Sequence, residues 1–411
     1  MIEKKGLRLE EIERKLLLAE GTAGLNLTST LFPGDKEGGT VLAIQATHKL
    51  ISGGMTFDNT QSEELGRQQG QLSAVFNSPF GLGESISLFG LARPTIKGMK
   101  GTGLDTPIRA GGVSVSVPVG HNGLTAGVSY MESMTRPGGA ASSLALEANM
   151  KSATGTISYP IHYSRNTAAF LRASLGWTDE VQHTNTSGED EDLSHDRVTT
   201  LRFGASVNQC KSGCLGLDFQ FSRGIDVGSR SHNEAGNGTP LSRSEGKTNF
   251  SHFNFNTNYK FSPVDNYEVD LNAGGQYSLD DLLNSEQTSI TGSNKLSGFT
   301  SGSISGDEAW YIRGQLNRNY NVSNQIKLTP YVYGAAGVAY TLSPTAVEER
   351  ATAAKSIGLG LKFQGLDKLF FQKTISGKVE YSKNWATGKL EDLSDVRLRK
   401  QHLLVLLAMN F

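Results

Sequence analysis

Hydrophobic and polar residues alternate along most of the chain, from Ile51 to the C-terminal Phe411. The clearest segment is Phe253–Phe261, where Phe, Thr and Tyr take every second position and Asn or Lys lies between them. Val113–Val119 and Ile357–Phe363 repeat this alternation. A period of two predicts β-strands with one apolar and one polar face. Asn and Lys opposite aromatic residues favour a wet lumen over a soluble protein core, as in a membrane β-barrel.

The polar connections between these segments are alternately short and long, which is typical of outer-membrane barrels with short periplasmic turns and long outer loops. The segments predict an all-β transmembrane barrel of about 16 antiparallel strands, wide enough for a channel. The last segment puts every second residue from Leu403 to Phe411 on one apolar face, so we expect the final strand to close against the first. The short turns are Asn77–Glu84, Gly120–Gly123, Ser164–Thr167, Gln209–Cys214, Pro263–Asn266, Val322–Asn324 and Gly365–Lys368. The long loops are near Lys97–Pro107, Arg136–Ser143, Asn185–Arg197, Ser229–Lys247, Thr291–Asp307, Ser343–Glu348 and Thr387–Asp395.

Composition agrees with a barrel and limits the alternatives. The 411 residues are 37% hydrophobic and 19% charged, with 48 glycines and a net charge of −1. A near-neutral chain argues against a nucleic-acid partner, and no run approaches the ~20 apolar residues of a transmembrane helix. The segment Met1–Gly6 has no signal-peptide pattern. If the protein is exported, we therefore expect that this sequence has lost its original N-terminus. A β-rich cytoplasmic protein is the less favoured alternative.

The first 49 residues follow a different pattern. Apolar residues at helical spacing predict an amphipathic helix of about three turns that ends near Gly21 or Gly24. These residues are Leu9, Ile12, Leu16 and Ala19. Alternation at Leu25–Leu31 and at Val41–Thr47 predicts two strands joined by a turn. Because one helix and two strands bury little core, we expect residues 1–49 to be the second part of a small α+β module, with residues 50–411 forming the barrel.

Motifs for catalysis are absent from the sequence, which has no HExxH, P-loop or GxSxG pattern. We therefore expect no enzyme activity and no cofactor. The acidic run Glu189–Asp192 suits either a divalent cation or a solvated surface, and we favour the surface. His183 and His195 lie in the same predicted loop, which is a weak metal signal, and we expect no metal site. We assign Trp177, Trp310 and Trp385 to an interfacial belt or to strand packing.

The two cysteines, Cys210 and Cys214, flank Lys-Ser-Gly in one of the short turns. An oxidising compartment favours a local disulfide between them. The alternatives are two free thiols or half of a metal site that lacks further ligands.

One polar loop contains an apolar hook. The stretch Ser285–Arg313 reads as the end of a strand, a Gly- and Ser-rich loop, and a new strand from Glu308. In the middle of the loop the dipeptide Gly298-Phe299 stands among polar residues. A long loop with an apolar hook is expected to fold back onto the protein, and we expect it to enter the barrel lumen.

Several stretches of the sequence resemble the outer-membrane transporters of two-partner secretion, the haemolysin secretion/activation family. Leu7–Asp35 is similar to the second half of that family's second POTRA domain, a periplasmic substrate-binding module. The remaining similarities run along the barrel. They are Phe57–Asn59 with Asn77–Gly83 for the first hairpin, Ser285–Asp307 with Trp310-Tyr311 for the sixth outer loop, and Pro330–Gly337 for the strand behind that loop. The family's signal peptide, plug helix, first POTRA domain and the start of the second are missing from the resemblance.

The resemblance implies a sixth outer loop that enters the lumen with a Val-Arg-Gly-Phe/Tyr tip, whose Arg contacts an Asp on the inner wall. The corresponding tip here is Leu296, Ser297, Gly298 and Phe299. The wall strand that faces it contributes Ala335, at the position of the Asp, and Gly337. Both members of the family's charge pair are thus replaced. Their joint loss avoids leaving one buried charge unpaired, which costs several kcal/mol.

The implied function is export of a large haemolysin- or adhesin-type partner, unfolded, across the outer membrane without ATP. The POTRA part would capture the partner by adding it to a sheet edge at Leu25–Leu31 or Val41–Thr47, and the sixth loop would gate the lumen. Arg313, Asn254, Asn256 and Asn258 are expected to face the passing chain. We expect a monomer in contact with outer-membrane lipid. A barrel-assembly insertase and a general diffusion porin are the alternatives.

Overall fold

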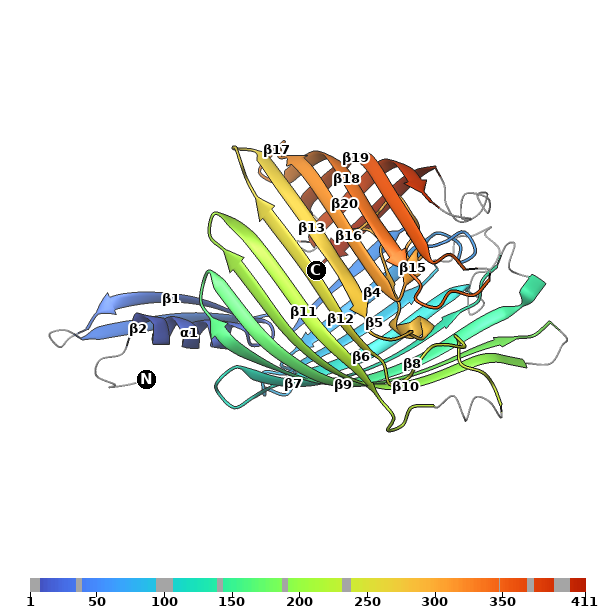
Figure 1. The fold of residues 1–411 in the computed structure, drawn as a ribbon. Helices are drawn as coiled ribbons and strands as arrows, with labels where there is room; N and C mark the ends of the chain where they lie inside the picture. The colour runs from blue at the N-terminus through green and yellow to red at the C-terminus, as the bar shows by residue number, and fades with distance from the viewer. Residues whose placement is uncertain are drawn as a thin grey trace.

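The alternating segments form one closed antiparallel barrel in the computed structural model, which describes residues 8–34, 39–93, 106–138, 143–186, 191–230, 238–346, 348–367, 373–387 and 400–411. Over these residues 16 strands close the barrel, and a two-residue strand, β17, lies beside β18. Figure 1 shows the strands strongly tilted and the N-terminal elements projecting from one end of the barrel. The prediction of a barrel of this size is confirmed.

The elements have the following bounds. The N-terminal part contains α1 (Leu9–Glu20), β1 (Leu25–Pro33) and β2 (Thr40–His48). The first half of the barrel contains β3 (Ile51–Asp58), β4 (Gln69–Asn77), β5 (Ser85–Ala92), β6 (Ile108–Val119), β7 (Leu124–Thr135), β8 (Leu146–Tyr163), β9 (Thr167–Thr184) and β10 (Glu191–Cys210). The second half contains β11 (Gly213–Ile225), β12 (Ser251–Phe261), β13 (Tyr267–Ser278), β16 (Glu308–Arg318), β17 (Tyr320–Asn321), β18 (Ile326–Tyr340), β19 (Ala351–Asp367), β20 (Lys373–Ala386) and β21 (Gln401–Asn410). A short helix, η2 (Asn284–Glu286), and the strands β14 (Thr288–Ser289) and β15 (Ser305–Gly306) belong to the loop between β13 and β16.

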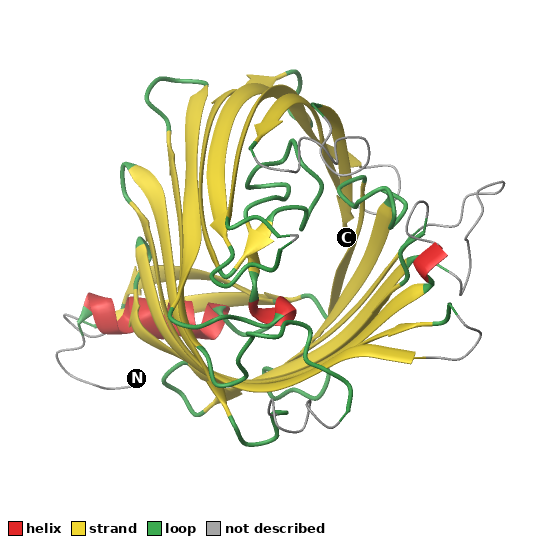
Figure 2. Cartoon of the chain, turned by 45° about the vertical axis from the view of Figure 1, so that its right-hand side comes forward, coloured by secondary structure: helices red, strands yellow, loops and turns green. Residues whose placement is uncertain are grey.

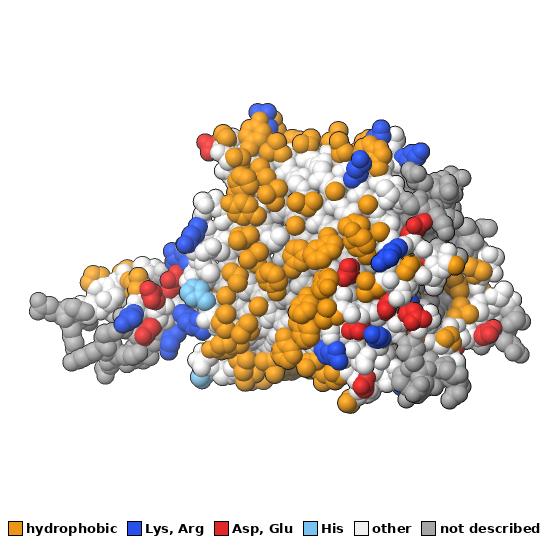
Figure 3. All heavy atoms as spheres, viewed as in Figure 1, with side chains coloured by type: hydrophobic (Ala, Val, Ile, Leu, Met, Phe, Trp, Pro, Cys, Tyr) orange, Lys and Arg blue, Asp and Glu red, His pale blue; other side chains and the backbone are white. Residues whose placement is uncertain are grey.

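Side chains alternate between the lipid side and the lumen along each strand. On β19, Ile357 and Leu359 are 55% and 60% exposed, whereas Ser356, directly before Ile357, is buried. Hydrophobic side chains cover the outer wall between charged groups near the ends of the barrel (Figure 3). The exposed apolar residues are therefore the lipid-facing band expected of an outer-membrane barrel, and the buried polar residues line its interior.

The barrel closes between its first and last strands, as predicted. Residues 406–410 of β21 pair with residues 58–54 of β3. Phe411 and Gly53 then exchange backbone hydrogen bonds of 2.9 and 3.0 Å. Beyond the ladder, the side chain of Asn59 continues the pairing: its Nδ2 donates to the Leu403 carbonyl and its Oδ1 accepts from the Val405 amide, both at 2.8 Å. A side-chain amide thus takes the place of backbone at the outer end of this seam.

The N-terminal elements match the predicted helix and two strands. β1 and β2 pair antiparallel over their whole length, and no residue of α1 is buried. The helix contacts β8 of the barrel, where Arg14 Nη2 donates to the Pro160 carbonyl at 3.1 Å. Within the described ranges, helices are all too short or too polar to cross a membrane.

Two expected boundaries were wrong. β13 ends at Ser278, so Ser285 belongs to the loop, where it is part of η2. β10 begins at Glu191, so half of the expected loop at Asn185–Arg197 is strand. The extension beyond the apolar band is held by cross-strand charge pairs, because Arg197 Nε donates to Asp179 at 2.7 Å. Because charged side chains stabilise this part of the strand, its sequence shows no alternation of hydrophobic and polar residues.

Other expectations fall outside the described residues. They concern most of the loop at Lys97–Pro107, Glu189 and Asp190 of the acidic run, Leu7 and Asp35 of the POTRA-like stretch, Lys368 of a turn, and most of the loop at Thr387–Asp395.

Candidate functional site

The loop that joins β13 to β16, residues 279–307, lies inside the barrel, and we call it the lumen loop. Figure 2 shows it as irregular chain between the walls, with η2 at its base and a short two-stranded piece within it. That piece is the pairing of β14 with β15. The loop therefore enters the lumen as a folded structure with its own hydrogen bonds.

An apolar cluster fastens the lumen loop to one side of the wall. Loop residues Ile290, Leu296, Phe299 and Ile304 are at most 4% exposed. They share a buried cluster with residues of the wall strands β16, β18 and β19: Ala309, Tyr331, Tyr333, Ala335, Ala339 and Ala354. Gly337 lies beneath the same cluster, since a Cβ added there would lie 3.2 Å from Ile290 Cδ1. Small residues on the wall thus make room for the loop's apolar side chains.

The tip of the loop is held by a buried charge pair that belongs to the wall. Arg313 of β16 and Glu380 of β20 lie 3.0 Å apart, with side chains only 3% and 1% exposed. The hydroxyl of Ser297 accepts a hydrogen bond from Arg313 Nη1 at 2.5 Å and donates one to Glu380 Oε1. The serine therefore completes the hydrogen bonding of both charges. Such completion is what a buried ion pair needs to offset its desolvation.

Aromatic residues of β18 support this pair. Tyr331 Oη donates to Glu380 Oε2 at 2.7 Å. The guanidinium of Arg313 lies over the ring of Tyr333, 3.6 Å from its centroid, which is a favourable cation–π arrangement. Gln315 Oε1 accepts from Arg313 Nη2 at 2.9 Å. The arginine is consequently fixed in one orientation, pointing at the loop tip.

Gly298 allows the loop backbone to approach β20 closely. Its carbonyl accepts a hydrogen bond from Asn384 Nδ2 at 2.6 Å. A Cβ at this position would lie 1.8 Å from Asn384 Oδ1 and 2.8 Å from Ser382 Oγ. Glycine suits this close contact, since a larger residue would displace either the side chains of Asn384 and Ser382 or the loop tip.

A second charge pair fixes the base of the loop. Asp307 is fully buried and lies 2.6 Å from Arg243 Nη1, in the connection between β11 and β12. Its carboxylate also accepts from the amides of Leu282 at 3.0 Å and Leu342 at 2.9 Å. One carboxylate thereby joins three outer connections of the barrel, those before β12, before β16 and after β18.

Glu286 of η2 forms a third buried contact. Its carboxylate accepts from Arg202 Nη2 at 2.7 and 2.9 Å and lies 3.3 Å from His252 Nε2. Burial raises the pKa of Glu286, but the hydrogen bond from His252 and the charge of Arg202 outweigh it and hold the pKa below its ordinary value. The base of the loop is thus anchored by an ionised carboxylate.

The loop also reaches the seam of the barrel. The amide of Ser301 donates to the carbonyl of Thr60 at 2.9 Å, just beyond β3. Beside this contact is a cavity of about 250 Å³, lined by Phe299 and by residues of β21 and of the connection after β3. The hook therefore touches the place where the first and last strands meet.

The structure brings the four predicted tip residues together in the lumen and places Ala335 and Gly337 on the wall beneath them. Ser297 and Ala335 stand where the resemblance implies an arginine and an aspartate. A charge pair is present, but both of its members are in the wall, and Ser297 hydrogen-bonds to them. Sequence reasoning missed Glu380 and Asn384. Their signal was a polar face on residues 373–386 that included an acidic residue in mid-strand.

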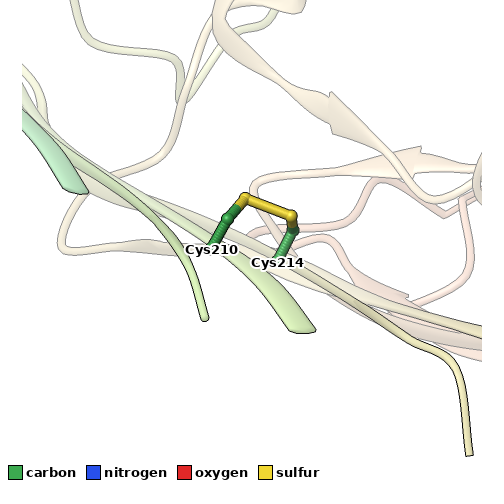
Figure 4. The surroundings of a disulfide bond; sticks show 2 residues. All are labelled: Cys210 and Cys214. Carbon is green, nitrogen blue, oxygen red and sulfur yellow. A yellow bond between two sulfur atoms is a disulfide. The ribbon is translucent and has the colours of Figure 1, made fainter. Parts of the chain in front are cut away.

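The remaining candidates lie elsewhere. Cys210 and Cys214 form a disulfide across the turn from β10 to β11 (Figure 4). His183 lies 3.7 Å from Glu147, whereas His195 lies 3.2 Å from Asp179. Among the described residues no three His, Cys, Asp or Glu side chains gather around a common point that suits a metal ion.

Comparison with known families decides what kind of barrel this is. Residues 38–362 match the family described as haemolysin secretion/activation protein ShlB/FhaC/HecB. The chain belongs to this family. It is accordingly an outer-membrane β-barrel transporter of the two-partner secretion type. No curated protein matches the sequence.

Solved structures of similar fold agree with the family. CdiB from Escherichia coli is 17% identical with a TM-score of 0.76, over 94% of this chain and 67% of that one. CdiB from Acinetobacter baumannii is 16% identical with a TM-score of 0.69, over 98% and 68%. BamA from Haemophilus ducreyi, lacking POTRA domains 1–3, is 12% identical with a TM-score of 0.57, over 98% and 78%. At these identities the similarity shows the shared fold.

Proposed function

We propose that this transporter exports one large unfolded partner protein from periplasm to cell surface, and that the lumen loop is its gate. The observation that carries the proposal is the position of the loop, whose tip is buried against Arg313 and Glu380 inside the barrel. In this position the loop occupies the route that a chain would take. Export then requires the loop to leave its site.

The arrangement of charges suits such a movement. The tip contributes a neutral hydroxyl, and the two charges remain paired with each other in the wall when the tip departs. Hydrogen bonds to charged groups contribute about 1.5–3 kcal/mol each, whereas separating a buried ion pair costs about 3–5 kcal/mol. Ser297 thus holds the tip firmly enough to close the lumen and leaves no unpaired charge behind on release.

Capture of the partner is assigned to residues 1–49, the partial POTRA domain. β1 and β2 form a two-stranded sheet in which, among the described residues, each strand has one unpaired edge. An extended segment of the partner would add to one of these edges through backbone hydrogen bonds. A photo-reactive residue at Thr30 of β1 and at Ala43 of β2 would show which edge is used. Crosslinking of an arrested partner at neither position would contradict capture by this sheet.

No nucleotide drives the step in this proposal. The partner enters unfolded, passes the polar lumen, and folds outside, which removes unfolded chain from the exit and makes return unfavourable. The proposal therefore needs only loop displacement and folding energy.

Deletion of the gene tests the function as a whole. Mass spectrometry would compare proteins of the medium and the outer membrane with and without the transporter. We expect one very large secreted or surface protein to disappear. A general decrease of outer-membrane barrels would instead indicate an insertase. Altered permeability to small solutes, with no protein lost, would indicate a porin.

A further inference from the structure

The lipid-facing wall contains a groove with glycine at its floor. Gly314 of β16 lies directly opposite Gly334 of β18. Both occupy outward positions, because their neighbours Ile312 and Val332 are 59% and 56% exposed. The groove measures about 700 Å³ and is lined almost entirely by apolar residues of β13, β16, β18, β19 and β20. Figure 3 shows white atoms, which belong to the backbone or to side chains that are neither hydrophobic nor charged, between hydrophobic side chains on the outer wall.

The two glycines are not required by packing within the protein. A Cβ at Gly334 would have no atom within 4 Å, and one at Gly314 would meet only Leu271 Cδ2 at 3.5 Å. Neither glycine has a positive φ. Glycine inside a strand weakens it and is often found where a ligand approaches the backbone. Neither packing nor backbone conformation of the barrel thus explains why glycine occupies these two outward-facing positions.

A cationic cluster stands at one end of the groove. Lys383 of β20 lines the groove, and Lys355 of β19 lies one step farther out, opposite Trp385. Their ammonium groups lie 5.4 and 5.7 Å from the centre of the Trp385 ring. Both lysines are exposed, and neither has an ion-pair partner among the described residues. Two positive charges thus flank one aromatic ring on the surface that faces lipid.

The depth of the cluster follows from strand geometry. From Lys355 to Gly365, near the periplasmic end of β19, the chain takes ten residue steps. At about 3.3 Å per residue and a tilt of about 40°, this corresponds to a height of about 25 Å, the thickness of the apolar band. The lysines therefore lie at the outer boundary of that band, and the groove lies at and below their level. A tryptophan is common at this boundary.

We propose that this groove binds a phosphorylated lipid of the outer leaflet. A lipid phosphate lies between Lys355 and Lys383, and an acyl chain lies along Gly314 and Gly334. The two unpaired positive charges select an anionic headgroup, and the apolar groove beside them takes its chain. A second copy of the barrel fits less well, because it would bring four lysines together. The proposal rests on the outer-membrane location and is independent of the export mechanism.

Native mass spectrometry of the detergent-purified barrel tests this proposal. The probe is a diphosphorylated glucosamine lipid, lipid A, compared with the same lipid after enzymatic dephosphorylation. We expect one molecule to remain bound only when phosphate is present. Since each surface lysine contributes about fivefold to anionic lipid binding, K355A/K383A should bind at least ~10-fold more weakly. G334L, whose Cβ would have no atom within 4 Å and whose side chain would occupy the groove, should also lose binding.

Lys151, an exposed lysine of β8 on the opposite side of the barrel, provides the matched control, and K151A should bind as the unchanged protein does. Heat-modifiable migration in gels verifies that each variant is folded. Equal binding of the dephosphorylated lipid, or unchanged binding by folded K355A/K383A and G334L, would overturn the proposal. A dimer of barrels in place of the lipid adduct would overturn it as well.

Discussion

Arg313 and Glu380 form an ion pair 3.0 Å apart, although their strands, β16 and β20, are not neighbours and β18 and β19 lie between them. The hydroxyl of Ser297 bonds to both side chains and so attaches the loop to the pair. In the pattern that the resemblance implies, the arginine is on the loop itself. Here both charges belong to the wall, and the loop tip contributes only a neutral hydroxyl to them.

Replacing the serine hydroxyl should loosen the loop. In S297A, Arg313 and Glu380 remain paired with each other. The loop tip loses its two hydrogen bonds to them, which contribute about 1.5–3 kcal/mol each. We expect a higher frequency of open events in planar-bilayer conductance. S305A is the matched control, because Ser305 Oγ donates only to the Gly302 carbonyl within the loop, at 3.3 Å. Equal conductance of S297A and S305A would show that the hydroxyl does not hold the tip.

Removing one member of the charge pair should cost more than removing both. R313M leaves Glu380 buried without its cation, for which we expect a loss of about 3–5 kcal/mol in the free energy of unfolding. The double variant R313M/E380L removes the uncompensated charge, and its loss should be clearly smaller than that of R313M. Denaturant unfolding in detergent measures both. If the free energy of unfolding falls at least as much in the double variant as in R313M, the two side chains do not act as a pair.

The close contact at Gly298 predicts a substitution that opens the channel. In G298A the new Cβ would lie 1.8 Å from Asn384 Oδ1 and would overlap it. We expect the loop tip to leave β20 as a result. We expect raised conductance, and restoration of the closed state in G298A/N384A. G90A is the control, since a Cβ at Gly90 would meet nothing within 4 Å. A closed channel in G298A would mean that the backbone shifts to accept the methyl group.

Acid should release the base of the loop. The pKa of Glu286 is lowered in the folded protein, so its contribution is complete above the ordinary glutamate value of about 4.3 and is lost as the pH falls through the lower, folded value. We expect channel opening to increase only below about pH 4. E286Q should lack this acid-dependent step and should open more readily at neutral pH. An identical pH profile in E286Q would assign the acid response to another group.

The barrel was predictable because its signal is local. Period-two alternation in segments such as Phe253–Phe261 indicates a strand and the residues that share each face without reference to any partner. The folding back of the loop was predictable from Phe299, an apolar residue in a polar stretch. Arg313 was also assigned correctly to the lumen side, and it is 3% exposed.

The partners of the loop tip were not predictable in the same way. Glu380 lies 83 residues from Ser297 in sequence, and only the closed barrel brings β20 opposite the loop. The resemblance implied a wall contact at Ala335, which lies in the apolar cluster under the loop. The carboxylate that Ser297 contacts is that of Glu380, on a different strand. The strand extension at Glu191 was missed for a similar reason, because charge pairs across strands replace the hydrophobic pattern there.

A reversible tether between loop and wall tests the central claim, that the lumen loop must move for export. The amide of Ser301 and the carbonyl of Thr60 are 2.9 Å apart, which brings the two backbones within reach of a disulfide. T60C/S301C would be made with Cys210 and Cys214 replaced by serine, and secretion of the partner would be measured before and after reduction. We predict that the oxidised protein secretes almost nothing and that reduction restores secretion, while T60C and S301C alone secrete normally. Undiminished secretion by the fully oxidised tether would contradict the account.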